Sequence, residues 1–424
     1  MTRIWNLSLR THAWPVSWKK SDLYPLPKVD IPKGISDFRG INVTPVIARC
    51  FEKAVLGTHA RETFDEHSGI SQFAYIEGGS CTNALLTIQH TVNQYLDIPE
   101  CKAVRLFAMD FSKAFDSVKH DLPSHKLKQL PLNPFIVNWY LSFLEDRQQR
   151  VIRNGFIGKW KRVNKGTTQA SVSGPHLFNV FLSDLEIHLD NKSVLVKYAD
   201  DTTIISPVIG DNDNSIALIN QFSQWSRSNG MCSNPSKCKE IIFRKKGCTI
   251  EFPIVSGIPQ TKELTILGVT FQEDSRFITH IREKLIKANK CLFILRSLRK
   301  EGYNQAEVDH LFLNLVLPNI LYGLSVFGAV NSELTTIQCF LDRCYKRKYT
   351  SDHINVYELL VQQDTRIFKN VFNNTIHPLR AIMPKKKSTK YNLRKETSHH
   401  PKINTDRFKN TFVNRLIFKH NLVL

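Results

Sequence analysis

A chain of 424 residues is long enough for two to three domains, each with a core of its own. Hydrophobic residues make up 42% and charged residues 23%, which is typical of a globular protein and excludes a disordered or fibrous one. Fifty-eight Lys and Arg against thirty-eight Asp and Glu leave a net charge of +20, and such a chain repels itself without a polyanionic partner. Composition therefore favours nucleic acid as the partner, although ribosomal, membrane-surface and heparin-binding proteins are also basic.

The cysteines and the N-terminus indicate the compartment. Nine cysteines, an odd number without a Cys-x-x-Cys pair or a Cys/His zinc spacing, favour reduced thiols. Residues 1–20 contain Arg, His and Lys, so they lack the apolar core of a signal peptide. The apolar stretch 311–330 is interrupted by Asn314 and Pro318, which favours a buried helix over a membrane span. We therefore expect an intracellular protein of the cytoplasm or nucleus that is not secreted and has no membrane partner.

The first half of the chain predicts a mixed α and β structure. Residues 18 to about 94 alternate Pro/Gly turns with short mixed segments, which predicts a small α+β unit. Residues 103–109 are almost continuously apolar apart from Arg105, as expected of a buried central strand. Residues 127–144 predict a helix with a break at a proline, and residues 178–189 predict a second helix that could cover a sheet.

The second half predicts a hairpin and then a helical region. The β-branched runs 194–199 and 203–206 flank two aspartates and a threonine, which predicts a hairpin with the acids in its turn. Residues 264–271 predict a strand. From Ile281 to Leu295 apolar residues recur at helical spacing among Lys and Arg, which predicts either a plain surface helix or one that follows nucleic acid. Residues 384–424 hold eleven Lys or Arg and two acids, which predicts a partly ordered arm that binds nucleic acid.

Three aspartates carry the chemistry. Asp200 and Asp201 are adjacent, and at an effective dielectric constant of about 20 two such carboxylates repel each other by about 4 kcal/mol unless a cation compensates. Asp110 directly follows the predicted strand 103–109 and supplies a third carboxylate. Oxygen ligands of this kind suit Mg²⁺, which binds through a few carboxylates plus substrate phosphates. The pattern predicts a two-metal site, although an isolated Asp-Asp pair is usually a solvated turn.

Several motifs in a fixed order carry a resemblance to a known family. They are Leu26-Pro-Lys, Asp37-Phe-Arg-Gly-Ile-Asn-Val-Thr, Gln72-Phe-Ala-Tyr, Phe107-Ala-Met-Asp-Phe-Ser-Lys-Ala-Phe-Asp-Ser-Val, Tyr198-Ala-Asp-Asp-Thr-Thr, Ser236-Lys-Cys-Lys and Leu267-Gly-Val-Thr-Phe. Through this set the chain resembles the reverse transcriptases of non-LTR retrotransposons, of the LINE and jockey type. The resemblance implies an RNA-directed DNA polymerase, a nucleotidyltransferase that uses an RNA template, a DNA primer, dNTPs and two Mg²⁺ ions, with Mn²⁺ as a possible substitute.

The resemblance also implies a fold and its division. It implies an α+β right-hand polymerase with fingers, a palm containing an antiparallel sheet, a helical thumb and a basic C-terminal helical extension. Residues 18–275 would form the fingers and palm, residues 276–345 the thumb and residues 346–424 the basic C-terminal region. The polymerase match begins close to Met1, so we expect a truncated reading frame without the endonuclease that often precedes the polymerase in this family. No RNase H motif is evident after the expected thumb, so we expect that the RNA strand is not degraded.

The resemblance assigns metal ligation to Asp110 and Asp200, with Asp201 beside them. Phe115 matches the aromatic ring that fills the space of a ribose 2′-hydroxyl and would select deoxynucleotides. Phe111 is placed with it at the nucleotide site, although both rings could instead belong to the core.

Four further polar residues match family positions. Gln169 matches the glutamine that contacts template and nucleotide. Lys28 and Arg39 match fingers positions that meet the triphosphate, and the alternative for both is a solvated surface charge. Lys237 matches the candidate acid for the leaving pyrophosphate, with Lys239 close enough to compete.

One segment departs from the family pattern Gly-Val-Pro-Gln-Gly-Ser-Val-Leu-Gly-Pro, because this chain has Gly166-Thr-Thr-Gln-Ala-Ser-Val-Ser-Gly-Pro175. Ala170 replaces a glycine, which costs about 1 to 2 kcal/mol if φ is positive there, and Thr168 removes a φ-fixing proline. Our hypothesis is a partly degenerate copy of low activity, which Ala170→Gly with Thr168→Pro would raise. The alternatives are a catalytically dead relic that only binds RNA or DNA, and a DNA-templated or terminal transferase.

Overall fold

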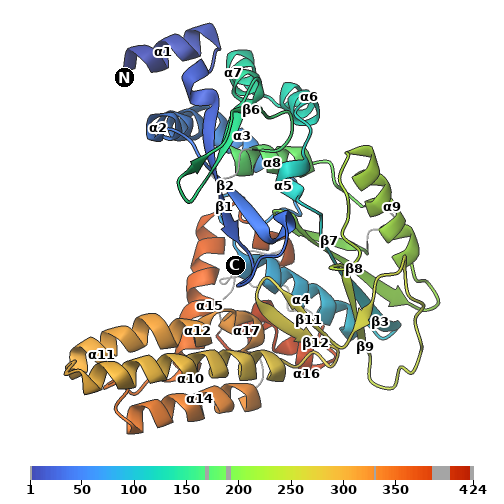
Figure 1. Ribbon diagram of the computed structural model, residues 1–424. Coiled ribbons are helices and arrows are strands. Elements are labelled where there is room, and N and C mark those ends of the chain that lie inside the picture. The colour runs from blue at the N-terminus through green and yellow to red at the C-terminus, as the bar shows by residue number, and fades with distance from the viewer. Residues whose placement is uncertain (1, 168–170, 188–191, 329–330, 384–401, 421–424) are drawn as a thin grey trace, which may run out of the picture.

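The computed structural model describes residues 2–167, 171–187, 192–328, 331–383 and 402–420 (Figure 1). At its centre lies a five-stranded sheet in the order β10-β9-β3-β8-β7. Its strands are β3 (Cys101–Met109), β7 (Val194–Tyr198), β8 (Asp201–Ile209), β9 (Lys239–Arg244) and β10 (Gln260–Thr261). All neighbours are antiparallel except β9 and β10. The strand and the hairpin predicted for this region are confirmed, and the sheet is the palm of an α+β right-hand fold.

Helices cover both faces of the palm sheet. On one face lies α4 (Cys81–Asp97), and on the other lie α8 (Gly174–Leu182) and α9 (Ser215–Ser228). The central strand β3 therefore buries Val104 and Leu106 on the α4 side and Phe107 and Met109 on the other. Burial on both faces is the physical reason for its almost continuous apolar sequence.

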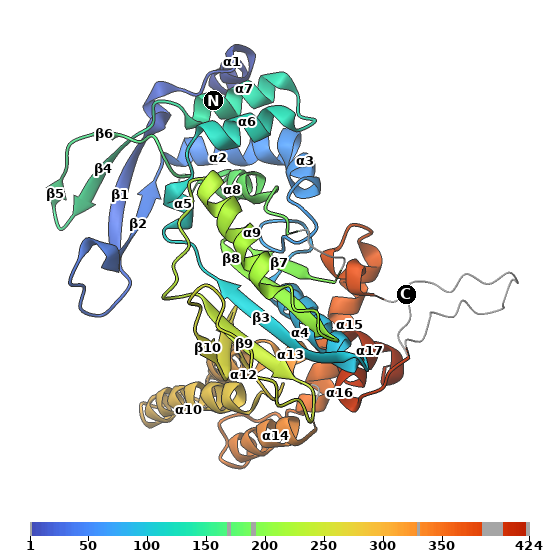
Figure 2. The same ribbon diagram turned by 90° about the vertical axis from the view of Figure 1, so that its right-hand side faces the viewer.

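The fingers lie at one end of the palm and the thumb at the other (Figures 1 and 2). A second sheet of the fingers contains β1 (Lys20–Pro27), β2 (Phe38–Val43), β4 (Gln148–Arg153), β5 (Phe156–Ile157) and β6 (Lys161–Arg162). The helical elements beside it are α1 (Thr2–Thr11), η1 (Val16–Lys19), η2 (Ile35–Asp37), α2 (Val46–Val55), η3 (Leu56–Ala60), α3 (Arg61–Glu66), α5 (Ala114–Ser117), α6 (Asp121–Gln129) and α7 (Pro134–Leu144). Stacked and edge-on rings of Trp14, Phe51 and Trp139 form the centre of the fingers core.

The thumb begins after a small hairpin. Residues 264–271 are not one strand but two, β11 (Glu263–Ile266) and β12 (Val269–Gln272), because Leu267 and Gly268 turn the chain with φ angles of 45° and 79°. The helix predicted from Ile281 is confirmed as α10 (Ile278–Lys300). It is followed by α11 (Gln305–Leu311), η4 (Phe312–Val316), α12 (Leu317–Leu321), α13 (Leu324–Phe327) and α14 (Asn331–Lys346). None of the described helices is long and apolar enough to cross a membrane.

The helix predicted for residues 178–189 is wrong at both ends, since α8 begins at Gly174 and ends at Leu182. The ammonium group of Lys197, fully buried, donates to the carbonyl oxygens of Leu182 at 2.9 Å and Leu185 at 3.2 Å. Leu182 O also accepts a hydrogen bond from Leu185 N at 3.0 Å, so Lys197 is a second donor to the last carbonyl group of the helix. A tertiary contact therefore reinforces the end of this helix, while its apolar pattern continues.

The C-terminal region returns to the palm. Its helical elements are α15 (Val356–Asn373), η5 (Pro378–Ile382), α16 (Asp406–Lys409) and α17 (Phe412–Phe418). Asp97 at the end of α4 accepts hydrogen bonds from Asn404 N at 3.0 Å and Thr405 Oγ1 at 2.6 Å, and Arg415 is buried against Asp364. Residues 402–420 therefore pack onto the palm and do not extend as a free arm, whereas nucleic-acid binding by this region stays a prediction. Residues 384–401 lie outside the described residues.

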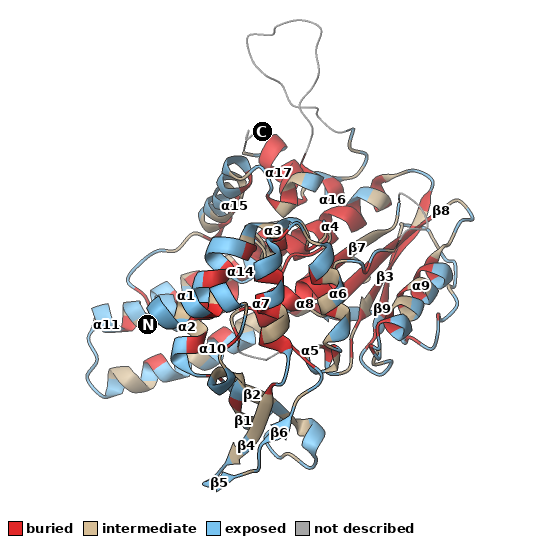
Figure 3. Ribbon diagram, turned by 90° about the horizontal axis from the view of Figure 1, so that it is seen from above, coloured by how far each residue is buried: buried red, intermediate tan, exposed pale blue. Residues whose placement is uncertain are grey.

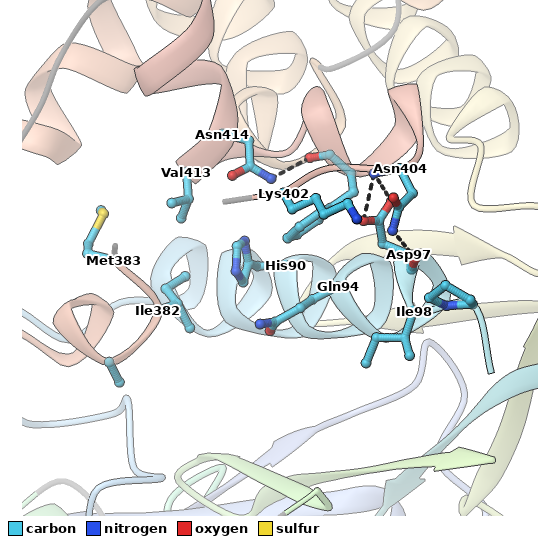
Figure 4. Close-up of a pocket in the computed structure, with 13 residues that line it drawn as sticks. His90, Gln94, Asp97, Ile98, Ile382, Met383, Lys402, Asn404, Val413 and Asn414 are labelled. Atoms are coloured by element: carbon cyan, nitrogen blue, oxygen red, sulfur yellow. Dashed lines mark hydrogen bonds between the residues drawn. The ribbon is translucent and has the colours of Figure 1, made fainter. Parts of the chain in front are cut away.

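A cavity of about 450 Å³ lies between the outer face of α4 and this C-terminal region (Figure 4). His90, Gln94 and Asp97 line it from α4, and Met383 and Asn414 from the other side. Burial lowers the pKa of His90 to about 4, so the ring is neutral at physiological pH. None of the predicted site residues lines this cavity. Figure 3 shows the buried residues around α4.

Candidate active site

The three predicted aspartates meet at one edge of the palm sheet. Asp110 follows the last residue of β3, and Asp200 and Asp201 lie at the turn between β7 and β8. The antiparallel register pairs Met109 with Thr202, so the end of β3 lies beside the turn of the hairpin. Strand pairing thus joins carboxylates that are far apart in the sequence.

The three aspartates line a cleft with a volume of about 570 Å³. Among the residues that line the cleft are Lys28, Arg39, Asp110, Phe111, Phe115, Asp200, Asp201 and Lys237. The structure therefore brings together all the predicted site residues that it describes, from the fingers, the palm and the segment after β9. Gln169 lies outside the described residues, and so do the changed positions Thr168 and Ala170.

The three aspartates bring negative charges close together in the cleft. Burial, together with the charge of Asp110, raises the pKa of Asp200, and the nearby Arg39 and Lys237 oppose this rise. Burial and the charges of Asp200 and Asp110 raise the pKa of Asp201 to about 6. Because each carboxylate disfavours ionisation of the next, a bound cation would stabilise the charged form of the group.

The donors fit a divalent cation. Asp110 Oδ2 is buried, accepts no hydrogen bond from a described residue and lies 3.5 Å from Lys237 Nζ. In the described residues, no group of three or more His, Cys, Asp or Glu side chains is disposed to hold a metal ion. Mg²⁺ usually binds through one or two carboxylates and the phosphates of the substrate rather than through an all-protein cage. The carboxylates of the cleft suit binding of that kind.

The two aromatic residues of the cleft differ in burial. Phe115 is half-buried and stacks on Phe178, with ring centroids 4.1 Å apart, so one side of the ring is supported by the core. Phe111 is only 3% exposed and stacks on Phe222 at 5.1 Å. Phe111 is thus a core residue at the border of the cleft, whereas the Phe115 ring is partly exposed on the cleft wall.

The fingers contribute two cations. Lys28 Nζ donates to the carbonyl oxygen of Ser36 at 3.2 Å, and the side chain of Arg39 is exposed at the start of β2. Both residues line the cleft from the β1–β2 hairpin, and Arg39 is close enough to Asp200 to oppose the rise of its pKa. An anionic ligand in the cleft would therefore lie near these cations as well as near the carboxylates.

Gly166 starts the segment that departs from the family pattern, and its geometry requires glycine. Its φ is 88°, and a Cβ atom would lie 3.1 Å from Phe115 O and from the Cα of Asp116. Beyond the undescribed residues, Val172 N donates to Glu52 Oε2 at 2.8 Å, and burial raises the pKa of Glu52 to about 7. Both flanks of the changed segment are thus held by the protein, and one of them lies against Phe115 and Asp116 of α5.

The structure reveals a residue to which the sequence motifs gave no role. Gln72 is completely buried, and its Oε1 accepts hydrogen bonds from Phe73 N at 3.1 Å, Ala74 N at 3.0 Å and Ala199 N at 3.0 Å. Ala199 directly precedes Asp200 and has a φ of 54°, which a residue with a Cβ atom rarely adopts. Gln72 therefore fixes the strained turn that carries the aspartates. Its presence in the motif Gln72-Phe-Ala-Tyr was the available signal.

Gln72→Leu is expected to lower kcat for nucleotide incorporation about tenfold, because an unsatisfied buried N–H at Ala199 costs about 1 to 3 kcal/mol and frees the turn. KM for the nucleotide should change less, since the residues of the fingers are untouched. Single-turnover extension kinetics would measure both. Gln72→Glu, which keeps an acceptor, should recover part of the rate, and Gln94→Leu on the outer face of α4 is the matched control. Parental kcat in Gln72→Leu would show that the turn does not need this hydrogen bond.

Three carboxylates at one edge of the palm sheet, in a cleft that the fingers also line, are typical of a nucleic-acid polymerase. A sequence profile described as reverse transcriptase (RNA-dependent DNA polymerase) matches residues 26–271. The chain therefore belongs to the reverse transcriptase family, whose members are nucleotidyltransferase enzymes.

Three of the most similar curated proteins come from non-LTR elements of Drosophila melanogaster. The chain is 25% identical over 366 residues to the RNA-directed DNA polymerase from mobile element jockey, covering 81% of this chain and 39% of that protein. It is 26% identical over 362 residues to the probable polymerase from transposon X-element, with coverages of 81% and 39%, and 26% identical over 368 residues to that from transposon BS, with 81% and 40%. The resemblance to this type of reverse transcriptase is confirmed, and the chain spans about 40% of the length of these relatives.

Solved structures with similarity include a telomerase from Candida tropicalis in complex with a fragment of telomeric RNA. Its TM-score is 0.48 at 12% identity, covering 87% of this chain and 65% of that chain. The RNA-dependent RNA polymerase of a human picobirnavirus has a TM-score of 0.44 at 14% identity, with coverages of 86% and 64%.

Proposed function

We propose that the cleft extends a DNA primer on an RNA template during the copying of a non-LTR retrotransposon. The observation that carries this proposal is the meeting of Asp110, Asp200 and Asp201 in one cleft with Lys28 and Arg39. Carboxylates and cations that line one cleft match a substrate that carries a triphosphate. The jockey, X-element and BS relatives are named as RNA-directed DNA polymerases, which supports RNA as the template.

In the proposed reaction the primer 3′-hydroxyl loses its proton to solvent, a bond forms between its oxygen and the α-phosphorus of a dNTP, and the bond from that phosphorus to pyrophosphate breaks. When bound, two Mg²⁺ or Mn²⁺ ions would lower the pKa of the primer hydroxyl and neutralise charge on the triphosphate. Asp110, Asp200 and Asp201 would hold these ions.

The remaining residues of the cleft would bind and orient the nucleotide. Arg39 presents a planar guanidinium group that suits phosphate oxygens, and Lys28 adds a second cation. Lys237, 3.5 Å from Asp110, would donate a proton to the leaving pyrophosphate. Gln169 would contact the nucleotide and the template. The fingers and palm would comprise residues 18–275, the thumb residues 276–345, and the basic C-terminal region residues 346–424.

The proposal is tested by primer extension on poly(rA)/oligo(dT) with Mg²⁺ and dTTP. We expect extension that EDTA abolishes, and a stronger signal on poly(rA) than on poly(dA). Extension on poly(dA) but not on poly(rA) would mean that the template is DNA and not RNA. No extension on either template, with RNA still bound in a salt-sensitive way, would reject polymerase activity of this chain.

Phe115→Ala is expected to reduce the preference for dUTP over UTP at least about tenfold, because removal of the ring opens space for a 2′-hydroxyl. Incorporation of dUTP should fall much less. Competing incorporation of the two nucleotides on poly(rA) gives the ratio directly. Phe372→Ala, which removes a 56% exposed ring on α15, is the control. An unchanged ratio would assign Phe115 to the core alone.

A further inference from the structure

A β-ribbon made of β4, β5 and β6 extends from the fingers, away from the rest of the molecule (Figures 2 and 3). Asn154 and Gly155, with φ angles of 48° and 81°, form its turn, as is typical of a tight hairpin. Phe156 is 68% exposed and Ile157 is 58% exposed. Large apolar side chains grouped on a projecting surface indicate contact with a partner.

The charge of the ribbon specifies that partner. Residues 148–165 contain six Lys or Arg and no Asp or Glu. A surface that sets an exposed ring beside cations and lacks anions fits a polyanion with flat apolar groups, which is the chemistry of single-stranded nucleic acid. A lipid surface or an acidic protein would match the cations but would not require the exposed ring.

One face of the ribbon collects these groups. Gln149, Val151 and Arg153 alternate along β4 and so share a face. Lys161 is the cross-strand partner of Gln149, and Phe156 is the partner of Arg153, which places both on that face. We call these five residues the ribbon face.

The cations of the ribbon face are available for a ligand. Arg153 lies 4.6 Å from the ring centroid of Phe38, and no carboxylate of a described residue pairs with Arg153 or Lys161. By contrast Arg150, which points to the other face, pairs with Asp22 at 2.7 Å and stacks on Trp160. The two faces therefore differ in whether their charges are already neutralised.

A cavity of about 290 Å³ connects the ribbon face with the active site. Gln149 and Lys165 line its ribbon end. Its other lining residues include Phe38, Gly40, Lys113 and Asp116, all of which also line the cleft of the aspartates. The surface from the aspartates to Phe156 is thus continuous, and Lys113, Lys165 and Lys161 are distributed along it.

We propose that the ribbon face binds the single-stranded template that has not yet been copied, with its phosphates at Arg153, Lys161 and Lys165 and a base stacked on Phe156. This inference rests on the proposed function, since it places a template strand in the adjoining cleft. Base stacking tolerates every base, which suits a strand that moves through the site during synthesis.

Binding without catalysis tests the proposal. Fluorescence anisotropy, in EDTA and without dNTP, would compare one primer–template duplex carrying 5′ template overhangs of about two and about twelve nucleotides. The unchanged protein should bind the long overhang more tightly. Phe156→Ala should weaken long-overhang binding about tenfold and leave short-overhang binding unchanged. Phe372→Ala is the matched control.

The charges are tested separately. Arg153→Gln with Lys161→Gln should reduce the slope of log K against log salt by about 1.4 for the long overhang, since each single-strand phosphate contact contributes about 0.7. Lys128→Gln with Lys246→Gln, two exposed cations elsewhere, should leave the slope unchanged. All variants should keep the parental unfolding midpoint, because the replaced side chains are exposed.

The outcomes separate this inference from the proposed function. The ribbon face would be overturned as a template surface if Phe156→Ala still bound the long overhang more tightly than the short one. The same holds if Lys128→Gln with Lys246→Gln lowered the salt slope as much as Arg153→Gln with Lys161→Gln. A protein or lipid partner would then remain. Primer extension on the short overhang is the independent reference. If the protein extends primers but binds both overhangs equally, only the template role of the ribbon face is rejected. If it binds the long overhang more tightly but does not extend primers, only the proposed polymerase activity is rejected.

Discussion

Asp200→Asn is expected to reduce primer extension at least about 1,000-fold, which corresponds to about 4 kcal/mol of activation free energy. The amide has the shape of the carboxylate but not its charge, so it removes a ligand for the proposed Mg²⁺ without a change in packing. Extension on poly(rA)/oligo(dT) at saturating dTTP measures the loss. Asp110→Asn should have an effect of the same order, because the two carboxylates line the same cleft.

The control for these variants is Asp211→Asn, which changes an exposed aspartate beyond the other end of β8. It should extend primers at the parental rate, and all three variants should bind RNA as the parent does. Extension by Asp200→Asn within a few-fold of the parent would mean that the chemistry occurs elsewhere. Loss of RNA binding together with extension would instead point to a disturbed fold.

Arg105→Met is expected to lower the free energy of unfolding by about 3 to 5 kcal/mol, because it leaves a buried carboxylate without its partner. Arg105 is fully buried in β3, where its Nε lies 2.6 Å from Glu240 Oε1 and its Nη1 lies 2.8 Å from Asp213 Oδ2. Glu240 is fully buried as well, so water cannot replace the lost cation. Urea unfolding followed by circular dichroism would measure the change.

Two further variants give this experiment its controls. Arg105→Met with Glu240→Leu removes both buried charges and should regain part of the lost stability. Arg150→Met breaks an ion pair in which the side chain of Arg150 is 29% exposed and that of Asp22 is 30% exposed. This variant should leave the unfolding midpoint near that of the parent. Equal effects of Arg105→Met and Arg150→Met would show that burial does not decide the strength of these pairs.

The sequence by itself determined the chemistry and the local elements that carry it. Asp110 after an apolar run and Asp200-Asp201 between β-branched runs predicted a strand, a hairpin and a carboxylate site, because burial on two faces and tight turns leave direct marks on composition. The ordered motifs were specific enough to predict the family and to assign Lys28, Arg39 and Phe115 to positions that line one cleft.

Only the tertiary structure decided what depends on contacts between distant residues. Lys197 reinforces the end of α8 at Leu182, and the turn before Asp200 depends on a hydrogen bond from Ala199 to Gln72. The return of residues 402–420 to α4 depends on Asp97, which an excess of Lys and Arg in the sequence concealed. Such partners are set by sheet register and packing, and neither periodicity nor charge along a single chain records them.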